Sequence, residues 1–556
     1  MIELMARSAP ARSVEWVAGD AKLRTPLVIS SPAFPLAGLK WVDSPDGRSI
    51  QLDGKELFSF TFGLEIPLAQ LEREGRGDRR CGQGCAIVKG AVTELGEEEV
   101  VIMGGALELR RDARRFAHAI AKARTLAGPN RLLYVPGAME PWNLALLIYA
   151  GADIIDTAAM EMQFALGRMP QAEGIFPADG GTLVKAAAEL ERELALIDRY
   201  MKGERLRELV EMRSPANPWG VAALRILDEE LYSYQEGMLP VNGPRFYCNS
   251  KQSLSRPDII RWRKGIAERY YRPAGKKVLL LLPCSAKKPY HQSKSHQAFL
   301  RALEGIPGRQ MVHEVIVTSP LGIVPREIEM YYPAAQYDIP VTGHWDREEV
   351  HMVQQAVKVA AAHGYEKIVC HLGEESWMVQ EVVDCIVTSE GSTTSNIALE
   401  DLRAGVTAAC RDVEPTRDDW RVEAMRTMVE FQFGPGARSM LDGCRVSGSY
   451  PFWRFQEGNN TQLGMFTPDR GMISLTIDGA KKLAEMNRLV VRMGDFQLKG
   501  NLFAKGVISA NEEIRPGDDV VIMRGTEVTG VGVASMTGRE MTELQRGEAV
   551  RMRHKA

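Results

Sequence analysis

The feature that most restricts the fold of this chain is a repeated alternation of buried-strand and helical sequence patterns. In the first part of the chain, strand patterns lie at 99–105, 131–137 and 152–157, and helical patterns lie at 110–126, 141–149 and 182–200. Repeated strand–helix units pair their strands in parallel, so they predict a parallel sheet that is either open or closed into a barrel. Asp156 then lies at the carboxyl end of a strand, which is the usual active face of such barrels.

A second strand–helix series begins after residues 235–258, a Gly/Pro-containing segment that we interpret as an inter-domain connection. The chain has 556 residues, which is too long for one compact domain. The second series has strand patterns at 277–282, 312–318 and 367–372, and helical patterns at 292–303 and 347–363. Asp346 and Glu349 have the spacing of a capping box at the start of the last helix.

The C-terminal residues, about 140 in number, have a different pattern. Short alternating runs, such as 471–479, 488–495, 505–510, 516–525 and 527–534, are separated by Gly and Asn. Evenly spaced short strands predict a small β-rich domain or barrel. The fold class expected for the whole chain is therefore multidomain, with α/β and α+β parts.

The net charge of -3, from 69 basic and 72 acidic residues, hides an uneven distribution. Residues 251–301 contain thirteen Lys/Arg and two Asp/Glu, a net of +11, and aromatic residues lie among the basic ones. A solvated basic helix face is one interpretation, and a surface for an anionic partner such as RNA is the other. The RNA-binding candidates in this stretch are Arg261, Arg263, Lys264, Lys276 and Lys277.

Several classes of protein are not supported by the sequence. The longest pure Val/Leu/Ile run, 278–282, covers about a quarter of a bilayer and the first residues lack a signal-peptide pattern, so no membrane association is expected. Eight mostly isolated cysteines favour a reduced, cytoplasmic setting. The close pair Cys81 and Cys85 lacks a second pair nearby, so no metal site is expected. Nucleotide-binding glycine motifs are absent, and we expect no cofactor.

The chemistry is expected in three segments that follow strand patterns, at 283–296, 318–327 and 371–375. In the first segment, Cys284 is a candidate nucleophile. The positive charges of Lys287 and Lys288 are expected to lower the pKa of its thiol. The candidate proton donors and acceptors of this segment are Tyr290, Ser293 and His296. The alternative is that Cys284 is a small residue at the end of a strand.

The same segment carries a recognisable motif. Pro283-Cys284, Lys288-Pro289-Tyr290, Ser293 and His296 form seven fixed residues at fixed spacing, and this pattern resembles the signature of the archaeosine synthase family. That family is a paralogue of the archaeal tRNA-guanine transglycosylases. Residues 318–327 and 337–346 resemble further blocks of its central domain.

The resemblance implies four domains. They are a degenerate transglycosylase-like (β/α) barrel at 1–245, a central α/β parallel-sheet catalytic domain at 246–412, a small pre-PUA domain at 413–485, and a PUA β-barrel at 486–556. A PUA domain binds RNA, so the resemblance adds Arg492, Lys499 and Lys505 to the RNA-binding candidates.

The resemblance also implies a reaction. The family acts on tRNA that carries 7-cyano-7-deazaguanine in its D-arm, and an amine nitrogen, from lysine or derived from glutamine, adds to the nitrile without ATP. A separate radical-SAM enzyme completes the lysine route, and a homodimer is expected from the transglycosylase resemblance.

The motif residues acquire roles from this reaction. Nitrile addition needs polarisation of the nitrogen and delivery of a proton to it. Cys284 is expected to attack the nitrile or to line its pocket, His296 and Tyr290 to transfer protons, and Lys287 or Lys288 to hold a phosphate or polarise the nitrile. The substrate-binding candidates are Asp156, Ser319, Arg326, His344, Asp346 and His371.

The surroundings of Asp156 differ from those in the transglycosylases. Residues 152–156 resemble the strand with their nucleophilic aspartate, but the Asp-Ser-Gly turn that supplies a partner carboxylate and the zinc cysteines are missing. We therefore interpret Asp156 as a relic or a base-pocket residue. Two other functions remain open: a base-exchanging tRNA transglycosylase that uses Asp156, and a non-catalytic tRNA-binding protein.

Overall fold

The computed structural model describes residues 1–61, 66–178, 180–341, 343–415, 417–458 and 460–556. The chain divides into two compact units. Unit 1 comprises Met1–Pro240, Lys499–Pro516 and Ser535–Val550, and unit 2 comprises Val241–Leu498, Gly517–Ala534 and Arg551–Ala556.

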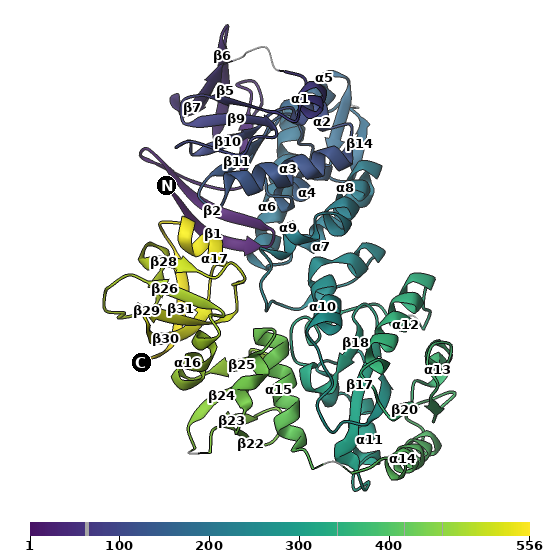
Figure 1. Ribbon diagram of the computed structural model, residues 1–556. Helices are drawn as coiled ribbons and strands as arrows, with labels where there is room; N and C mark the ends of the chain where they lie inside the picture. The colour runs from purple at the N-terminus through teal and green to yellow at the C-terminus, as the bar shows by residue number, and fades with distance from the viewer. Residues whose placement is uncertain (62–65, 179, 342, 416, 459) are drawn as a thin grey trace. The chain divides into compact units, whose positions relative to one another are not determined.

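Unit 1 contains a nine-stranded sheet with the strand order β7-β6-β5-β4-β12-β11-β10-β9-β8 (Figure 1). The strands are β4 (Leu27–Ser30), β5 (Leu39–Ser44), β6 (Gly47–Leu52), β7 (Lys55–Thr61), β8 (Gly77–Cys81), β9 (Cys85–Gly90), β10 (Val100–Met103), β11 (Leu132–Val135) and β12 (Ile154–Asp156). The six strands in the middle of this order, β5, β4, β12, β11, β10 and β9, are parallel to one another. At one end of the sheet β6 and β7 pair antiparallel, and at the other end β8 does so. Ser59 of β7 and Gln83 beside β9 exchange two backbone hydrogen bonds, so the ends meet and the barrel is nearly closed.

The helices of unit 1 follow the predicted alternation. They are α1 (Leu68–Glu74), α2 (Ala106–Leu109), α3 (Ala113–Ala127), α4 (Pro141–Tyr149), α5 (Ala158–Ala165), α6 (Leu183–Lys202), α7 (Leu206–Arg213), α8 (Pro218–Glu229) and α9 (Tyr232–Glu236). Helix α3 begins after Asp112, whose carboxylate accepts the N–H of Arg115 at 3.0 Å. Every residue of β10, β11 and α4 is buried, which explains why β10 and β11 are continuously apolar and why Asn143 is the one polar residue of α4.

The strands β4 to β9 of the large sheet precede the predicted alternation, which began at residue 99, and two smaller sets of strands lie outside it as well. The first 24 residues form an antiparallel sheet of β1 (Ile2–Ser8), β2 (Ala11–Ala18) and β3 (Ala21–Arg24). A hairpin of β13 (Arg168–Gln171) and β14 (Gly174–Pro177) precedes α6. The sequences of these two smaller sets mix polar and apolar residues without a clean period, which is why the sequence did not reveal them.

Unit 2 contains a five-stranded sheet with the order β18-β17-β16-β20-β21 (Figure 1). Its strands are β16 (Val278–Pro283), β17 (Val312–Thr318), β18 (Gly322–Pro325), β20 (Lys367–Cys370) and β21 (Ile386–Val387), and its helices are α10 (Pro257–Glu268), α11 (Lys294–Ala302), α12 (Arg347–Ala361), α13 (Ser376–Gln380) and α14 (Asn396–Arg411). Only β18 is antiparallel. Leu280 and Leu282 of β16 pack with Phe299 of α11 and Leu402 of α14 in one core cluster.

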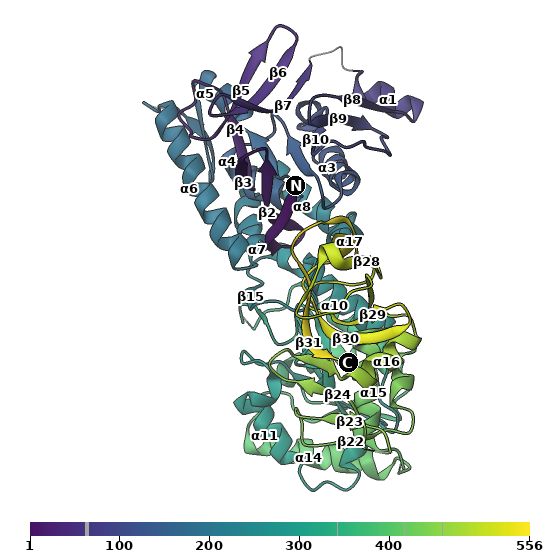
Figure 2. The ribbon, with the colours of Figure 1, turned by 90° about the vertical axis from the view of Figure 1, so that its left-hand side faces the viewer.

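The remaining elements are rich in strands, as predicted. An antiparallel sheet of β22 (Arg445–Ser447), β23 (Arg454–Gln456), β24 (Gln462–Thr467) and β25 (Met472–Leu475) is accompanied by α15 (Trp420–Phe433) and α16 (Ile477–Glu485). The last sheet, seen at the yellow end of the chain in Figure 2, has the order β27-β31-β30-β29-β26-β28. Its elements are β26 (Val490–Met493), β27 (Leu502–Phe503), β28 (Val507–Ala510), β29 (Asp519–Arg524), β30 (Glu527–Ala534), α17 (Gly538–Glu543) and β31 (Glu548–Lys555).

The predicted fold class is confirmed: a nearly closed barrel, a mostly parallel α/β sheet and a strand-rich C-terminal part are all present. The exact domain boundaries stay predictions. Over the described residues, no helix combines the length and the apolar character needed to cross a bilayer.

Candidate active site

Three strand ends meet at one edge of the sheet of unit 2. Strand β16 lies between β17 and β20, and all three are parallel, so Cys284, Ser319 and His371 follow their carboxyl ends. The chain leaves β16 first toward β17 and later returns toward β20 on the other side, and ligands in α/β sheets bind where the strand order reverses in this way. The fold thus brings together the three segments in which the sequence predicted chemistry.

Cys284 stands at the centre of this edge, directly after β16. The residue is solvent-accessible, yet enough protein surrounds the thiol that desolvation is the largest influence on its pKa and raises it. A hydrogen bond from Thr318 and the positive charge of Lys288 act in the opposite direction, and the charge of Glu375 adds to the increase. The expected net lowering of the thiol pKa is therefore wrong, because burial outweighs the lysine.

Lys288 is the lysine that faces Cys284. Its Nζ lies 4.1 Å from the ring centroid of Tyr337 and 5.8 Å from that of Tyr290, and burial lowers its pKa. The negative charge that a Cys284 thiolate would carry acts in the other direction and raises the pKa of Lys288. Lys287, in contrast, is exposed to solvent. Of the two predicted lysines, Lys288 is the one placed to act on the same group as Cys284.

A chain of three buried hydroxyl groups lies beside the thiol. The hydroxyl oxygens of Tyr290 and Tyr337 are 2.5 Å apart, and that of Tyr337 is 2.6 Å from Oγ1 of Thr318. Burial raises the pKa of both tyrosines, so both remain protonated near neutral pH. The chain therefore connects Tyr290, through Tyr337, to the Thr318 hydroxyl that contacts Cys284.

Ser293 and His296 hold the backbone of the motif in place. Ser293 is the N-cap of α11, and its hydroxyl accepts the N–H of His296 at 3.2 Å. The buried ring of His296 donates from Nε2 to the carbonyl of Pro283 at 2.9 Å and accepts at Nδ1 from Arg326 at 2.8 Å. Both ring nitrogens are occupied, and burial lowers its pKa to about 4. This arrangement fits a positioning role and does not fit the predicted proton transfer.

Two of the predicted substrate-binding residues, Arg326 and His371, form hydrogen bonds with other residues of the chain. Arg326 donates to Glu314 at 2.9 Å and to Glu329 at 3.0 Å in addition to His296. The buried His371 donates from Nε2 to the carbonyl of Thr393 at 2.9 Å, and its Nδ1 lies 2.8 Å from Oγ1 of Thr388. Neither side chain is free to bind a substrate in this arrangement, because each is used to fix its loop.

The start of α12 carries three more candidates. Asp346 is the N-cap and forms the predicted capping box with Glu349. Ser319 donates to the same Glu349 at 2.6 Å, which ties the end of β17 to α12. Asp346 and His344 are exposed. Of these three candidates, Ser319 is buried and only Asp346 and His344 are accessible to a substrate.

Asp156 lies in unit 1, at the carboxyl end of β12 as predicted, but it is 1% exposed. Its carboxylate accepts the Tyr134 hydroxyl at 2.6 Å, the N–H of Gly137 at 3.0 Å and the N–H of Ala158 at 3.0 Å. Desolvation is the largest influence on its pKa and raises it. A buried carboxylate with three donors organises its surroundings, and it does not offer a free nucleophile for base exchange.

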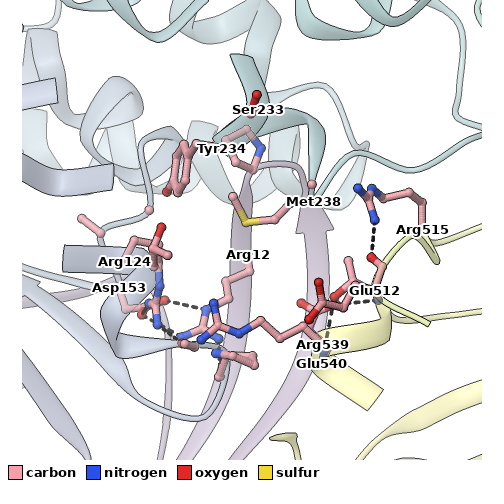
Figure 3. Close-up of a pocket in the computed structure, with 18 of the residues that line it drawn as sticks. Arg12, Arg124, Asp153, Ser233, Tyr234, Met238, Glu512, Arg515, Arg539 and Glu540 are labelled. Atoms are coloured by element: carbon pink, nitrogen blue, oxygen red, sulfur yellow. Dashed lines mark hydrogen bonds and ion pairs between the residues drawn. The ribbon is translucent and has the colours of Figure 1, made fainter. Parts of the chain in front are cut away.

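A hollow of about 460 Å³ opens at the other end of the same strand (Figure 3). Arg12 and Arg124 both donate to Asp153, which precedes β12, with Arg12 Nη2 at 2.9 Å from Oδ2. Both guanidinium groups also donate to backbone carbonyls, among them that of Arg131. These bonds use most of their donors and tie β2, α3 and β12 together. The hollow is at the amino end of the strand, away from the usual active face.

The predicted RNA-binding residues differ in exposure. Lys276 is buried and donates to the carbonyl of Val312 at 2.9 Å, so it is not available to RNA. Arg263 is partly buried and donates to the carbonyl of Leu254, and Lys277 pairs with Glu366 at 3.0 Å. Arg261 is partly buried as well. The exposed members of the predicted set are Lys264, Arg492, Lys499 and Lys505.

Residues with metal-binding side chains do not gather in the described part of the chain. No group of three or more His, Cys, Asp or Glu there is placed to hold a metal ion. Of the close cysteine pair, Cys85 is buried and Cys81 lies 3.5 Å from a carboxylate oxygen of Glu98.

Sequence reasoning overlooked three residues that the structure places beside Cys284. They are Thr318, Tyr337 and Glu375. Thr318 and Tyr337 begin two of the segments that resembled family blocks, and this resemblance was the available signal. Glu375 follows β20 in the third chemical segment, where two adjacent glutamates gave no reason to choose one.

Comparisons with known proteins match the chain to two family models and to curated relatives. Residues 259–406 match a domain of unknown function (DUF5591), and residues 491–556 match the PUA domain. "Archaeosine synthase subunit alpha" of Methanosarcina acetivorans is 35% identical, over 83% of this chain and 80% of that protein. "Archaeosine synthase" of Haloferax volcanii is 31% identical, over 80% of each. "tRNA-guanine(15) transglycosylase" of Methanothermobacter thermautotrophicus is 24% identical, over 79% of this chain and 68% of that protein.

Proposed function

The chain belongs to the archaeosine synthase family, and on that premise we propose that it adds an amine nitrogen to the nitrile of 7-cyano-7-deazaguanine in the D-arm of tRNA. It is a tRNA-modifying transferase of archaeosine biosynthesis. The observation that carries the proposed reaction is the position of Cys284, which lies in the family motif at the carboxyl end of β16 together with Lys288 and the Thr318 hydroxyl.

The reaction consists of an addition of the thiol to the nitrile and a displacement of the thiol by the amine, and neither step needs ATP. The Cys284 sulfur forms a bond to the nitrile carbon while one proton goes to the nitrile nitrogen, which gives a thioimidate. The amine nitrogen then bonds to the same carbon, the C–S bond breaks, and the thiol regains a proton from the amine. The sum is the addition of one N–H across the triple bond, and no leaving group is lost from the substrate.

Proton transfer falls to the groups that surround the thiol. In the resting site the raised pKa keeps Cys284 as a thiol, so a base must take its proton as the substrate reacts. Lys288, whose pKa is lowered, exchanges protons near neutral pH more readily than an ordinary lysine. The Tyr290–Tyr337–Thr318 hydroxyls stay protonated and serve as donors to the nitrile nitrogen.

The amine donor that we propose is lysine, with a glutamine-derived nitrogen as the alternative. An amine attacks only when it is uncharged, so a base near Cys284 must accept its proton. Glu375 is near enough for its charge to raise the pKa of Cys284, and we assign it this task. Relatives named "subunit alpha" support a partner subunit, which we take to be the radical-SAM enzyme that completes the product.

The test is the mass of the nucleosides in tRNA that carries 7-cyano-7-deazaguanine, after incubation with the enzyme and either lysine or glutamine. The wild-type chain is expected to give a lysine adduct. Cys284→Ala is expected to abolish adduct formation, and Cys284→Ser is expected to retain a small fraction of the wild-type activity. Cys444→Ala is the matched control and should retain full activity. It removes another thiol of unit 2, which donates a hydrogen bond to the Met440 carbonyl.

Undiminished adduct formation by Cys284→Ala would remove Cys284 from the chemistry. A nucleoside mass that never changes with either donor would contradict the proposed reaction, and incorporation of labelled free base into unmodified tRNA would indicate base exchange.

A further inference from the structure

A cavity of unit 2 is lined by none of the side chains to which the proposed reaction assigns bond formation or proton transfer. It encloses about 500 Å³, within the size range of small-molecule pockets. Strand β18 pairs with β17 only from Val315 onward, so the edge of β17 at 312–314 is left open. Elements from α15 and from the segment before β23 lie over this edge.

One part of the cavity wall is apolar and aromatic, and the rest is formed by polar and charged residues. The apolar and aromatic part includes Leu300, Val312, Trp420, Ala424, Tyr450 and Trp453. The rings of Trp420 and Trp453 meet edge to face with centroids 5.6 Å apart, and those of Tyr450 and Trp453 do so at 5.3 Å. Edge-to-face contacts fix these rings, so the cavity offers a preformed surface on which a flat apolar body can pack.

Lys276 forms the polar end of the cavity. The residue is 8% exposed, its Nζ donates to the Val312 carbonyl at 2.9 Å, and it lies 5.2 Å from the ring centroid of Trp420. Among the residues that the structure describes, no carboxylate forms an ion pair with it. A buried ammonium group with one acceptor keeps two further donors, and the carboxylates of Glu314 and Glu327 act on its charge without forming an ion pair with it.

The carboxylates of the cavity are already used. Glu314 accepts from both Arg309 and Arg326, and Glu327 accepts from Tyr270 and lies 3.2 Å from Nε2 of His313. A cationic ligand would therefore find no free acceptor among them. An anionic ligand would find Lys276, so the charges favour an anion.

We propose that this cavity is a binding site for a small molecule that carries a carboxylate on a flat apolar body. The carboxylate pairs with Lys276, and the body packs between Trp420, Trp453 and Leu300. A bare phosphate would leave the aromatic walls unfilled. A nucleotide of RNA would have to bring a phosphodiester with its two flanking sugars to the buried end, whereas a terminal carboxylate reaches it alone.

The electrostatics of Lys276 agree with this assignment. Burial is the largest cause that lowers its pKa, to about 8; the nearby charge of Arg309 acts in the same direction, whereas the charges of Glu327 and Glu314 act in the opposite one. An anion at this position restores the charged form of the lysine and forms a charge-assisted hydrogen bond.

The experiment compares two probes of nearly the same shape, indole-3-acetate and the uncharged indole-3-acetamide, titrated into the full chain in a calorimeter without tRNA. Indole-3-acetate is expected to bind at least about tenfold more tightly, since a hydrogen bond to a charged group contributes about 1.5–3 kcal/mol. Lys276→Met is expected to reduce the affinity for the acetate to that for the acetamide. Lys294→Met, on the exposed surface of α11, is the matched control and should leave both affinities unchanged.

A second variant changes the apolar wall of the cavity and leaves Lys276 in place, so it can be used if Lys276→Met does not fold. Leu300→Trp fills the cavity from a half-buried position and is expected to abolish binding of both probes. The proposal is overturned if neither probe binds the wild-type chain, if both bind equally, or if a folded Leu300→Trp chain still binds the acetate. It is also overturned in favour of an RNA site if tRNA displaces the acetate and Leu300→Trp weakens tRNA binding.

Discussion

The guanidinium group of Arg326 donates to Nδ1 of His296 at 2.8 Å, and this single contact determines what the histidine can do. With Nδ1 occupied as an acceptor, the proton of the neutral ring lies on Nε2, which donates it to the carbonyl of Pro283 at 2.9 Å. Pro283 is the residue before Cys284. Arg326 therefore fixes the motif backbone through His296, and His296 acts on the reaction by position.

His296→Gln is expected to keep at least about half of the adduct-forming activity, because the amide can accept from Arg326 and donate to Pro283 as the ring does. His296→Ala is expected to cost about 3 kcal/mol of stability, since it leaves buried polar groups of Arg326 and Pro283 without partners. Activity and urea unfolding of the two variants test this. If His296→Gln folds normally but forms no adduct, the ring transfers protons and the positioning role is wrong.

The same burial predicts how stability depends on pH. The folded chain holds the pKa of His296 at about 4, below its ordinary value of 6.5, so the unfolded chain takes up a proton first as the pH falls. The stabilisation is present above the unfolded value and is lost between about pH 6.5 and about pH 4, by about 3 kcal/mol in total. Urea midpoints across this range should fall steeply for the wild type and less for His296→Gln. Equal slopes would contradict the assignment.

The sequence was informative where a local pattern decides the structure. It placed β17 and α4 correctly to the residue, and it identified the Asp346–Glu349 capping box from spacing alone. The cysteine motif and the three strand ends of the site were also predicted, since parallel strands place their carboxyl ends at one edge.

The contacts that give the site its character are not local. Tyr337 lies 47 residues after Tyr290, and Arg326 lies 30 residues after His296, so no spacing rule indicates that either pair is in contact. Burial is equally hidden: Lys276 and Lys277 are adjacent and chemically identical, yet one is enclosed and the other pairs with Glu366 at the surface. Sequence patterns predicted the frame of the site, and tertiary packing selected which residues act in it.

Tyr337→Phe is expected to slow adduct formation at least about tenfold, because it interrupts the hydroxyl chain between Tyr290 and Thr318. The loss of stability should be about 1 kcal/mol. Tyr331→Phe is the matched control: it also removes a buried hydroxyl, which contacts Gln432 at 3.1 Å, and should cost similar stability without slowing the reaction. Single-turnover rates measure both, and equal rates for the two variants would exclude a role for the chain.

Asp156→Asn is expected to lower the melting temperature while leaving the rate of nitrile addition within about twofold of the wild type. The substitution weakens the bonds from Tyr134, Gly137 and Ala158, which a carboxylate accepts better than an amide. Thermal unfolding and single-turnover adduct formation measure the two effects separately. Loss of the adduct in a variant that remains folded at the assay temperature would show that Asp156 takes part in the reaction.

Charge removal should separate exposed lysines from enclosed ones in tRNA binding. Lys264 and Lys505 are exposed, so a phosphate can reach each of them, and replacement by Gln should reduce the slope of log affinity against log salt by about 0.7–0.9 for each phosphate that is no longer neutralised. Lys276 is enclosed, and Lys276→Met should leave that slope unchanged. Filter binding of tRNA over a range of salt concentrations measures the slopes. A decrease for Lys276→Met equal to that for Lys264→Gln would mean that RNA reaches the cavity, whereas unchanged slopes for both exposed variants would place the phosphate contacts on other basic residues.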